Sequence, residues 1–422
     1  MNFKLDELIY QSPECTGLNR EPNRSPLFPF KKESDARHAG QNRGPWYRTL
    51  NGDWKFNYYE KPQDIPENFM APSVNDSKWK TIDVPSCWDM RGYDYPHYTN
   101  AQMPWGELPP KVPAERNPTG IYRRTFDIPK NWAGRRILLH FDGVESCFAA
   151  YVNGTAAGMS KDSRGSTEFD VTELVRTGRN QITVLVIKWS DGTFIEDQDH
   201  WWHAGIVRSV YLYSTGKNHI ADVHVTATLD DTFENGLLKV DMQTGHPEKI
   251  DPENAPFLAV RVYDENDTLV FEQKQNCGKH PALEWGTADY RRIHTGLSGM
   301  IEKVHPWSAE IPSLYTLTVT LYDKKGKEQE AVSQRIGFRT VKVEKRQLLV
   351  NGQPVLICGV NRHEHDDLNG RTVSMELMRK DLVLMKQFNI NAIRTSHYPD
   401  APEFYDLCDE YGFYVIDEAN LE

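Results

Sequence analysis

Short hydrophobic runs separated by turn residues dominate the first 340 residues of the chain, where long helical periodicity is almost absent. Runs at 136–141, 148–152 and 181–187 are alternating or continuously apolar, and turn pairs such as Asn153-Gly154 separate them. Such runs between turn signals are typical of strands that pack face to face. The pattern therefore predicts a β-sandwich from about residue 46 to residue 214.

A second series of alternating runs follows a turn-rich junction at 214–217. The runs have spacings that suit a small sandwich of about 100 residues, and they lie at 220–228, 237–242, 257–263 and 315–322. We predict an immunoglobulin-like domain at 219–337. It gathers no convergent polar residues, so its expected role is that of a spacer.

The pattern changes after residue 338, where strand-like and helix-like segments alternate. An apolar run at 354–360 predicts a buried strand, and 374–388 predicts an amphipathic helix capped by Ser374, with Glu376 and Lys380 facing outward. A second strand at 390–393, a helix at 402–411 ended by Gly412, and a third strand at 413–416 follow. This order predicts parallel pairing with right-handed crossovers, as at the start of an α/β barrel.

Polar residues follow each of these three strands. They occupy 361–365, 394–398 and the acidic positions Asp417, Glu418 and Glu422. Active sites of parallel barrels lie at the carboxyl ends of the strands. Taken singly, each cluster has a structural explanation, because histidines can cap a strand and an arginine can pair with a buried carboxylate. Three clusters on one face favour a functional site.

A zinc site is an alternative for the first cluster. It would draw on His363, His365 and Glu422, but neither a helical His-x-x-x-His spacing nor a third histidine supports it.

Composition limits the possible partners. The chain has 422 residues, a net charge of -11 and 39% hydrophobic residues, which predicts two or three domains and disfavours nucleic acid and anionic membranes as partners. The first residues lack the apolar core of a signal peptide, and no stretch approaches the length of a membrane span, so a cytoplasmic location is expected. The six scattered cysteines predict reduced, mostly buried thiols.

Several ordered motifs carry a resemblance that extends over nearly the whole chain. The segment 391–399, followed by Phe404-Tyr405, Asp409 and 412–416, resembles the first signature of glycoside hydrolase family 2. The segments 358–365 and 381–387 are similar to the bacterial β-galactosidases of the lactose-operon type within that family. Further matching segments are 50–56, 84–88, 117–122, 190–199 and 307–315.

The resemblance implies a multidomain fold. An extended segment at 1–45 would precede a jelly-roll sugar-binding domain at 46–218, the immunoglobulin-like β-sandwich at 219–337, and the first three βα units of an incomplete TIM barrel at 338–422. Three strands cannot close a barrel, so we expect the remainder to come from downstream sequence or a second chain. A homo-oligomer is expected for the complete enzyme.

The resemblance also implies roles for individual residues. Asn117 and Asp199 would contact galactose hydroxyls, and Asp199 would also hold Na⁺. Glu422 would be a ligand of Mg²⁺. His363 and His397 would stabilise the transition state, and Arg394 would orient the nucleophile.

Sequence chemistry alone favours simpler interpretations for two of these residues. Asn117 precedes Pro118 and fits a turn, and 196–199 fits a solvated acidic loop. Nearby tryptophans could stack on sugar rings or belong to the core, and they are Trp189, Trp201 and Trp202.

The implied activity is that of a retaining β-galactosidase, in which one carboxyl group acts as acid and base and a second as nucleophile. Both catalytic glutamates are expected beyond residue 422, so the chain alone is predicted to be inactive, and Asp417 and Glu418 are not expected to replace them. Two alternatives stay open: a non-catalytic carbohydrate-binding protein, and a β-glucuronidase or β-mannosidase relative.

Overall fold

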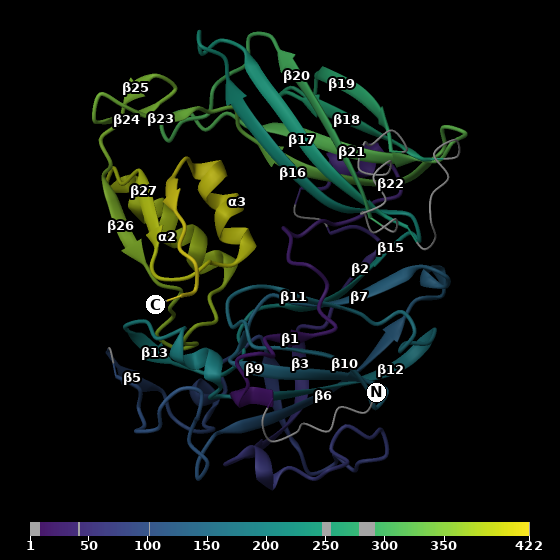
Figure 1. Ribbon diagram of the computed structural model, residues 1–422, viewed down its shortest axis with the longest axis vertical. Helices are drawn as coiled ribbons and strands as arrows, with labels where there is room; N and C mark the ends of the chain where they lie inside the picture. Colours follow the sequence, from purple (N-terminus) through teal and green to yellow (C-terminus); the bar gives the residue numbers. More distant parts are fainter. Residues whose placement is uncertain (1–8, 41–42, 101, 247–254, 278–291, 422) are drawn as a thin grey trace.

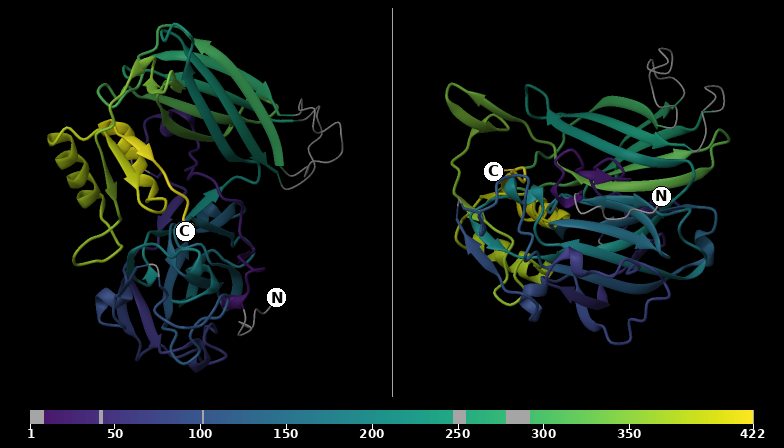
Figure 2. Two further views of the ribbon diagram at one scale, coloured as in Figure 1. Left: turned by 60° about the vertical axis from the view of Figure 1, so that its left-hand side comes forward. Right: turned by 60° about the horizontal axis from the view of Figure 1, so that its bottom comes forward.

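A computed structural model describes residues 9–40, 43–100, 102–246, 255–277 and 292–421. The chain folds into three bodies: a jelly roll, an immunoglobulin-like sandwich, and an α/β segment at the carboxyl end of the chain (Figure 1). The α/β segment lies beside both sandwiches (Figure 2), and it is hydrogen-bonded to the second sandwich through Asp409 and to the jelly roll through Glu364 and Asn420. Within the described ranges, no helix has the length and apolar character needed to cross a membrane.

The jelly roll consists of two main antiparallel sheets. Its larger sheet has the order β1-β10-β9-β12-β6-β3-β4, and its smaller sheet has the order β11-β7-β15-β2. The strands of the larger sheet are β1 (Gly17–Leu18), β3 (Gly52–Tyr59), β4 (Lys80–Val84), β6 (Thr119–Ile128), β9 (Cys147–Val152), β10 (Thr155–Ser160) and β12 (Gly178–Ile187). Those of the smaller sheet are β2 (Tyr47–Thr49), β7 (Arg136–Phe141), β11 (Thr167–Asp170) and β15 (Val210–Thr215).

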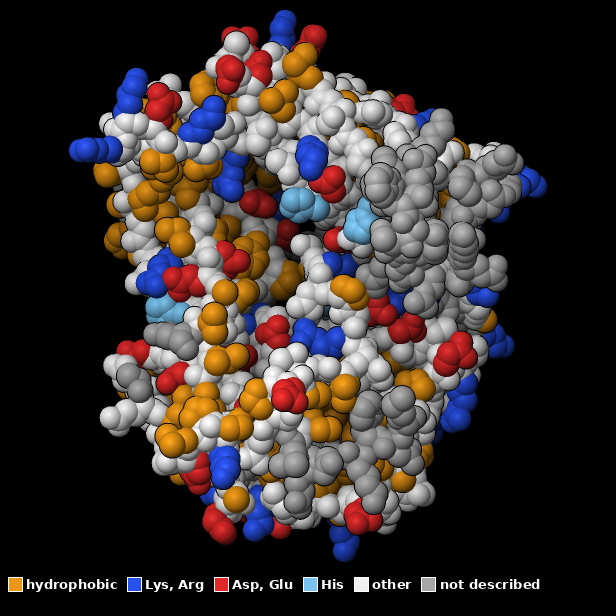
Figure 3. Space-filling model, viewed as in Figure 1, with side chains coloured by type: hydrophobic (Ala, Val, Ile, Leu, Met, Phe, Trp, Pro, Cys, Tyr) orange, Lys and Arg blue, Asp and Glu red, His pale blue; other side chains and the backbone are white. Residues whose placement is uncertain are grey.

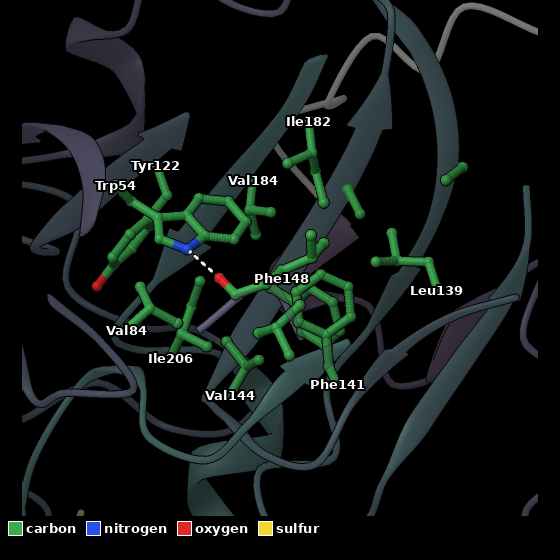
Figure 4. Close-up of a cluster of buried hydrophobic side chains, with 14 of the residues drawn as sticks. Trp54, Val84, Tyr122, Leu139, Phe141, Val144, Phe148, Ile182, Val184 and Ile206 are labelled. Atoms are coloured by element: carbon green, nitrogen blue, oxygen red, sulfur yellow. Dashed lines mark hydrogen bonds between the residues drawn. The ribbon is translucent and has the colours of Figure 1, made fainter. Parts of the chain in front are cut away.

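The apolar runs predicted as strands form the interior of this sandwich. Phe141 of β7, Phe148 of β9 and Val184 of β12 meet between the sheets (Figure 4). The buried Trp54 indole donates a hydrogen bond to the Leu50 carbonyl at 2.8 Å, so its one polar atom is paired within the core. Two short ladders flank the sandwich, β5 (His97–Thr99) with β13 (His200–Trp202), and β8 (Val144–Glu145) with β14 (Gly205–Ile206).

The second sandwich has sheets β16-β17-β20 and β19-β18-β21-β22. Its core residues, such as Val240, Val260 and Val319, are fully buried between the two sheets. The strands are β16 (His219–Leu229), β17 (Gly236–Gly245), β18 (Phe257–Tyr263), β19 (Leu269–Asn276), β20 (Arg292–Ile301), β21 (Tyr315–Tyr322) and β22 (Glu328–Ile336).

The amino-terminal segment, expected to be extended, contains some regular structure among its described residues. β1 pairs with β10 at the edge of the jelly roll, and the short helix α1 (Glu33–Arg37) packs on β21 and β22 of the second sandwich. An isolated bridge joins Phe30 to Ala331. Burial of Ala36 and Phe30 against the second sandwich explains the departure from a simple extended chain.

The α/β segment begins with the hairpin sheet β23 (Val341–Glu344), β24 (Gln347–Val350) and β25 (Gln353–Pro354). A parallel sheet, β26-β27-β28, then alternates with two helices, as predicted. Its elements are β26 (Gly359–Arg362), α2 (Met375–Gln387), β27 (Ala392–Thr395), α3 (Pro402–Tyr411) and β28 (Tyr414–Ile416).

The start of α2 and the end of α3 lie where the sequence signals predicted. The Ser374 hydroxyl accepts the Leu377 N–H at 3.2 Å and caps α2, while Glu376 and Lys380 are exposed. Gly412 terminates α3 with a φ of 76°, and a Cβ at this position would lie 2.5 Å from the Ala309 carbonyl oxygen. Glycine is therefore required by both conformation and space.

The first parallel strand is the main correction to the predicted elements. The run 354–360 was expected to be a buried strand, but the ladder with β27 starts at Gly359, and Leu356 is 85% exposed. A strand of a parallel sheet is buried only when it has neighbours on both edges and faces. Among the described residues β26 pairs with β27 alone, so the apolar run before it stays uncovered.

Candidate active site

The carboxyl ends of the three parallel strands bring together the predicted barrel residues. His363 directly follows β26, Arg394 lies in β27, and His397 follows β27. The imidazole rings of His363 and His397 are 5.6 Å apart and nearly perpendicular. The three side chains therefore form one cluster, on the face predicted from the parallel topology.

Glu418, just after β28, is the anionic centre of this cluster. Its carboxylate accepts the Arg394 Nε–H at 2.6 Å and lies 2.9 Å from Nδ1 of His397. Burial opposes the charge on Glu418, but the hydrogen bonds from Arg394 and His397 outweigh it and lower the pKa of the carboxyl. The carboxylate thus fixes the orientation of both predicted site residues.

The other acidic residue of this strand end is also engaged. Asp417 accepts hydrogen bonds from the Thr395 hydroxyl at 2.9 Å and the Tyr405 hydroxyl at 2.6 Å. With Glu418 held by Arg394, both carboxylates have partners. Their exclusion from the acid and nucleophile roles stays a prediction.

His363 is held in its neutral form. Burial, followed by the nearby charge of Arg371, lowers the pKa of His363 to about 4. Its Nδ1 lies 3.4 Å from the Tyr398 hydroxyl. A neutral imidazole offers one donor and one acceptor, which suits recognition of a hydroxyl group near pH 7.

A loop of the jelly roll reaches this cluster. His200, which begins β13, lies 6.2 Å from His363 between ring centroids. Asp199 precedes it, is exposed, and accepts a 2.5 Å hydrogen bond from the Tyr98 hydroxyl of β5. Asp199 also contributes to the electrostatic environment of His363. The two domains therefore converge on one site.

The segment 196–199 is not the solvated acidic loop that sequence chemistry alone favoured. Glu196 and Gln198 are buried, and both contact Asn420 after β28, at 2.7 Å and 3.0 Å respectively. Burial raises the pKa of Glu196 to about 7, and Ser163 binds its carboxyl through backbone and hydroxyl. Only Asp199 of the acidic residues in this loop is exposed.

Asn117 is bound to the backbone that follows β12. It is buried, and its carboxamide makes two hydrogen bonds with the Trp189 backbone, each 2.9 Å long. Trp189 and Trp202 pack in the core with ring centroids 5.6 Å apart, whereas Trp201 is 45% exposed and lies 5.4 Å from Tyr98. Trp189 and Trp202 thus belong to the core, and Asn117 fixes the backbone at Trp189.

Of the two metal ligands expected from the resemblance, the structure describes Asp199 but not Glu422. Glu422, expected to bind Mg²⁺, lies outside the described residues. Asp199 presents carboxylate oxygens at the surface, a donor type that suits a hard cation such as Na⁺. The alternative zinc set of His363, His365 and Glu422 also depends on Glu422, and the His365 ring lies 6.4 Å from the His203 ring between centroids.

A buried polar joint fixes the jelly roll to the α/β segment. Arg208 donates to Glu364 from Nη2 at 2.5 Å and from Nε at 3.2 Å, and its guanidinium also binds the carbonyls of Arg164 and Pro399. Beside it, Glu145 pairs with Arg164 and Arg371.

Arg371 extends this joint to the active-site cluster. It donates to the Tyr398 hydroxyl at 2.8 Å and to the Trp201 carbonyl at 2.7 Å. Figure 3 shows the molecule hollowed between the three bodies.

Sequence reasoning missed several of these supporting residues. Tyr98, Arg371 and Glu145 have no spacing relation to the motifs that they support, so only the folded contacts reveal them. Glu418 and Tyr398 were inside quoted motifs, and the alternation of strand ends with polar residues was the signal that could have assigned them positioning roles.

The chain thus combines a jelly roll, an immunoglobulin-like sandwich and parallel βα units that carry a His-Arg-Glu cluster at their strand ends. Profiles of one family match consecutive parts of the chain: glycosyl hydrolases family 2, sugar binding domain, at 47–216; glycosyl hydrolases family 2 at 218–339; and the family's TIM barrel domain at 341–422. The chain belongs to glycoside hydrolase family 2.

Curated relatives that match the chain include proteins named beta-galactosidase. A beta-galactosidase of Priestia megaterium is 40% identical over 416 residues, which cover 97% of this chain and 39% of the relative. A beta-galactosidase of Aeromonas hydrophila is 40% identical over 424 residues, with 98% and 40% covered. The chain therefore spans about two fifths of the length of these relatives.

Solved structures share the fold. A beta-glycosidase from Bacteroides vulgatus matches with a TM-score of 0.71 at 25% identity, over 88% of this chain and 44% of that one. Bacteroides uniformis beta-glucuronidase matches with a TM-score of 0.73 at 22% identity, over 89% and 42%. At that identity the second match concerns the fold alone.

Proposed function

We propose that this chain is the amino-terminal portion of a retaining β-galactosidase, which hydrolyses terminal non-reducing β-D-galactose residues of lactose-like β-galactosides by double displacement. The observation that carries the proposal is the convergence of His363, Arg394 and His397 with the Asp199 loop of the sugar-binding domain. The identity to proteins named beta-galactosidase supports this substrate class.

In this proposal the described residues bind and orient the sugar. Asp199 and Asn117 recognise galactose hydroxyls, with Asp199 held by Tyr98. His363 and His397 contact the sugar and strengthen these contacts as positive charge develops at the anomeric carbon. Arg394 orients the nucleophile. Because His363 is neutral, it takes part in a hydroxyl hydrogen bond without repelling the oxocarbenium-like transition state.

The catalytic carboxyl pair is assigned to sequence beyond residue 422, supplied downstream or by a second chain. Asp417 and Glu418 are committed to other partners, which supports this assignment. The exposed Leu356, Phe388 and Ile416 provide apolar surface that further barrel strands and helices would cover. The 422-residue chain alone is accordingly expected to lack hydrolytic activity.

The remaining elements of the proposal concern ions and setting. Mg²⁺ would be bound through Glu422 and Na⁺ through Asp199, where a hard cation would organise oxygen ligands around the sugar. The complete enzyme would be a cytoplasmic homo-oligomer that acts in lactose catabolism.

Asp199→Ala in the completed enzyme tests the proposal. We expect at least a tenfold rise in KM for a nitrophenyl β-galactoside together with loss of Na⁺ activation, since one carboxylate serves both roles. Asp127→Ala, at an exposed residue on β6 of the same domain, is the matched control and should change neither. Unchanged hydrolysis and unchanged Na⁺ response in Asp199→Ala would refute the assigned role.

A substrate panel separates the alternatives. The completed enzyme should show a higher kcat/KM for the β-galactoside than for the matching β-glucuronide or β-mannoside. Preference for either of those would move the chain to the corresponding relatives. Galactose binding without turnover of any of them would instead indicate a non-catalytic carbohydrate-binding protein.

A further inference from the structure

Three buried side chains of the jelly roll gather beside the α/β segment. Cys87 directly precedes the short helix η3 (Trp88–Arg91), Asp89 lies within it, and His203 follows β13. One potential ligand atom of each lies within 4.8 Å of the others. All three side chains are more than nine-tenths buried.

The polar atoms of this cluster are incompletely paired. His203 Nδ1 lies 2.8 Å from Oδ2 of Asp89, but His203 Nε2 and Asp89 Oδ1 are buried without a hydrogen-bond partner among the described atoms. The Cys87 sulfur accepts one N–H, from the Arg371 backbone at 3.3 Å. Buried polar atoms that lack partners are costly, and a bound ion is one way to satisfy them.

His365, which is exposed, is the candidate fourth ligand. The His365 ring lies 6.4 Å from the His203 ring, tilted by 30°, at the entrance of the loop 366–370. A bound cation with thiolate and carboxylate ligands would have its double charge neutralised, which permits burial. Sulfur, imidazole nitrogen and carboxylate oxygen are the ligand types of tetrahedral Zn²⁺, whose ligand atoms are separated by about 3.5 Å. Modest closure of the cluster reaches that spacing.

We propose that Cys87, Asp89, His203 and His365 form a binding site for Zn²⁺ or a similar transition metal, which fastens the loop after β26 to the jelly roll. When the metal ion binds, the Cys87 thiol loses its proton to solvent and the thiolate becomes a ligand. The site is structural, because the loop that it would anchor carries Arg371, whose guanidinium holds Tyr398 beside His363. The inference is independent of the proposed galactosidase activity.

Metal analysis of the purified chain tests the site, with Zn²⁺ present during expression because the buried ligands admit an ion most readily as the protein folds. We expect about one equivalent of zinc to survive gel filtration. Refolding with Co²⁺ should give the near-ultraviolet charge-transfer band of a cobalt–thiolate bond. Cys87→Ser should remove the band and lower retained metal at least tenfold.

Cys147→Ser, at another buried cysteine of the same domain, is the matched control and should keep both signals. His203→Gln should weaken binding at least tenfold. X-ray absorption of the zinc-loaded wild-type chain makes the test independent of variant folding, since it should show one sulfur ligand. Absence of retained metal, absence of a sulfur ligand, or a cobalt band that persists in Cys87→Ser would overturn the proposal.

Discussion

Substitution of Glu364 by glutamine should loosen the α/β segment from the jelly roll. Glu364 is the buried counter-ion of Arg208, and Glu364→Gln keeps the shape but leaves the Arg208 charge with only carbonyl partners. Removing one member of a buried ion pair typically costs about 3–5 kcal/mol.

The neighbouring Asp400 places this case at the lower end of that range. Burial, followed by the Glu364 charge, raises the pKa of Asp400 to about 7, with Arg362 and Arg208 opposing the rise. When Glu364 loses its charge, the pKa of Asp400 falls and its carboxylate compensates in part for the loss. We therefore expect a cost of about 3 kcal/mol, equivalent to roughly a 150-fold change in a local opening equilibrium.

Amide hydrogen exchange measures this change where it occurs. Exchange of the β26 and β27 amides should accelerate by roughly 100-fold or more in Glu364→Gln, while core amides of the immunoglobulin-like domain keep their rates. Asp241→Asn is the control, because its pair with Lys239 is exposed and should be worth about 1 kcal/mol or less. An acceleration below about fivefold in β26 and β27 would refute the inference that this ion pair fastens the two bodies.

Two further predictions concern stability. Glu330 accepts the Gly216 N–H at 3.0 Å, and burial raises the pKa of its carboxyl to about 7. The folded state therefore holds this proton more tightly than the unfolded state. Up to about 3 kcal/mol of stability that is present below pH 4.5 should be lost as the pH rises to 7. Glu330→Gln should flatten that slope in thermal melts recorded at several pH values, and an unchanged slope would exclude Glu330 as its source. Gly412→Ala should destabilise α3 by several kcal/mol because of the Ala309 carbonyl, whereas Gly326→Ala, with similar φ and open space, should cost about 1 kcal/mol. Equal costs in urea unfolding would contradict the steric argument.

Local signals explain which elements could be predicted from the sequence. Helix α3 was predicted over its observed bounds because Pro402 starts it and Gly412 stops it, and both act through their own backbone conformation. The strand predicted at 354–360 instead begins at Gly359, because burial of a strand depends on neighbours that are distant in the sequence. Parallel topology alone was enough to bring His363, Arg394 and His397 to one face.

Contacts between domains could not be predicted in this way. Nothing near Asp199 in the sequence indicates that Tyr98 binds it, or that Glu196 is buried by a residue more than 200 positions away. The role expected for Asn117 at a ligand stays a prediction, but its pair of hydrogen bonds with the Trp189 backbone had no signal in the sequence. Such pairings depend on the tertiary fold and leave no periodic trace.

Asn420 has a consequence for how such enzymes can be recombined. Its side chain donates to Glu196 and accepts from Gln198, so one residue after β28 supports the jelly-roll loop that presents Asp199. A chimera that joins this jelly roll to the barrel of another family member would keep both folds, yet would lose the loop position unless the new barrel also supplied an amide at this point. Substrate preference in such hybrids should therefore follow the match between loop and strand end, and neither parent domain alone.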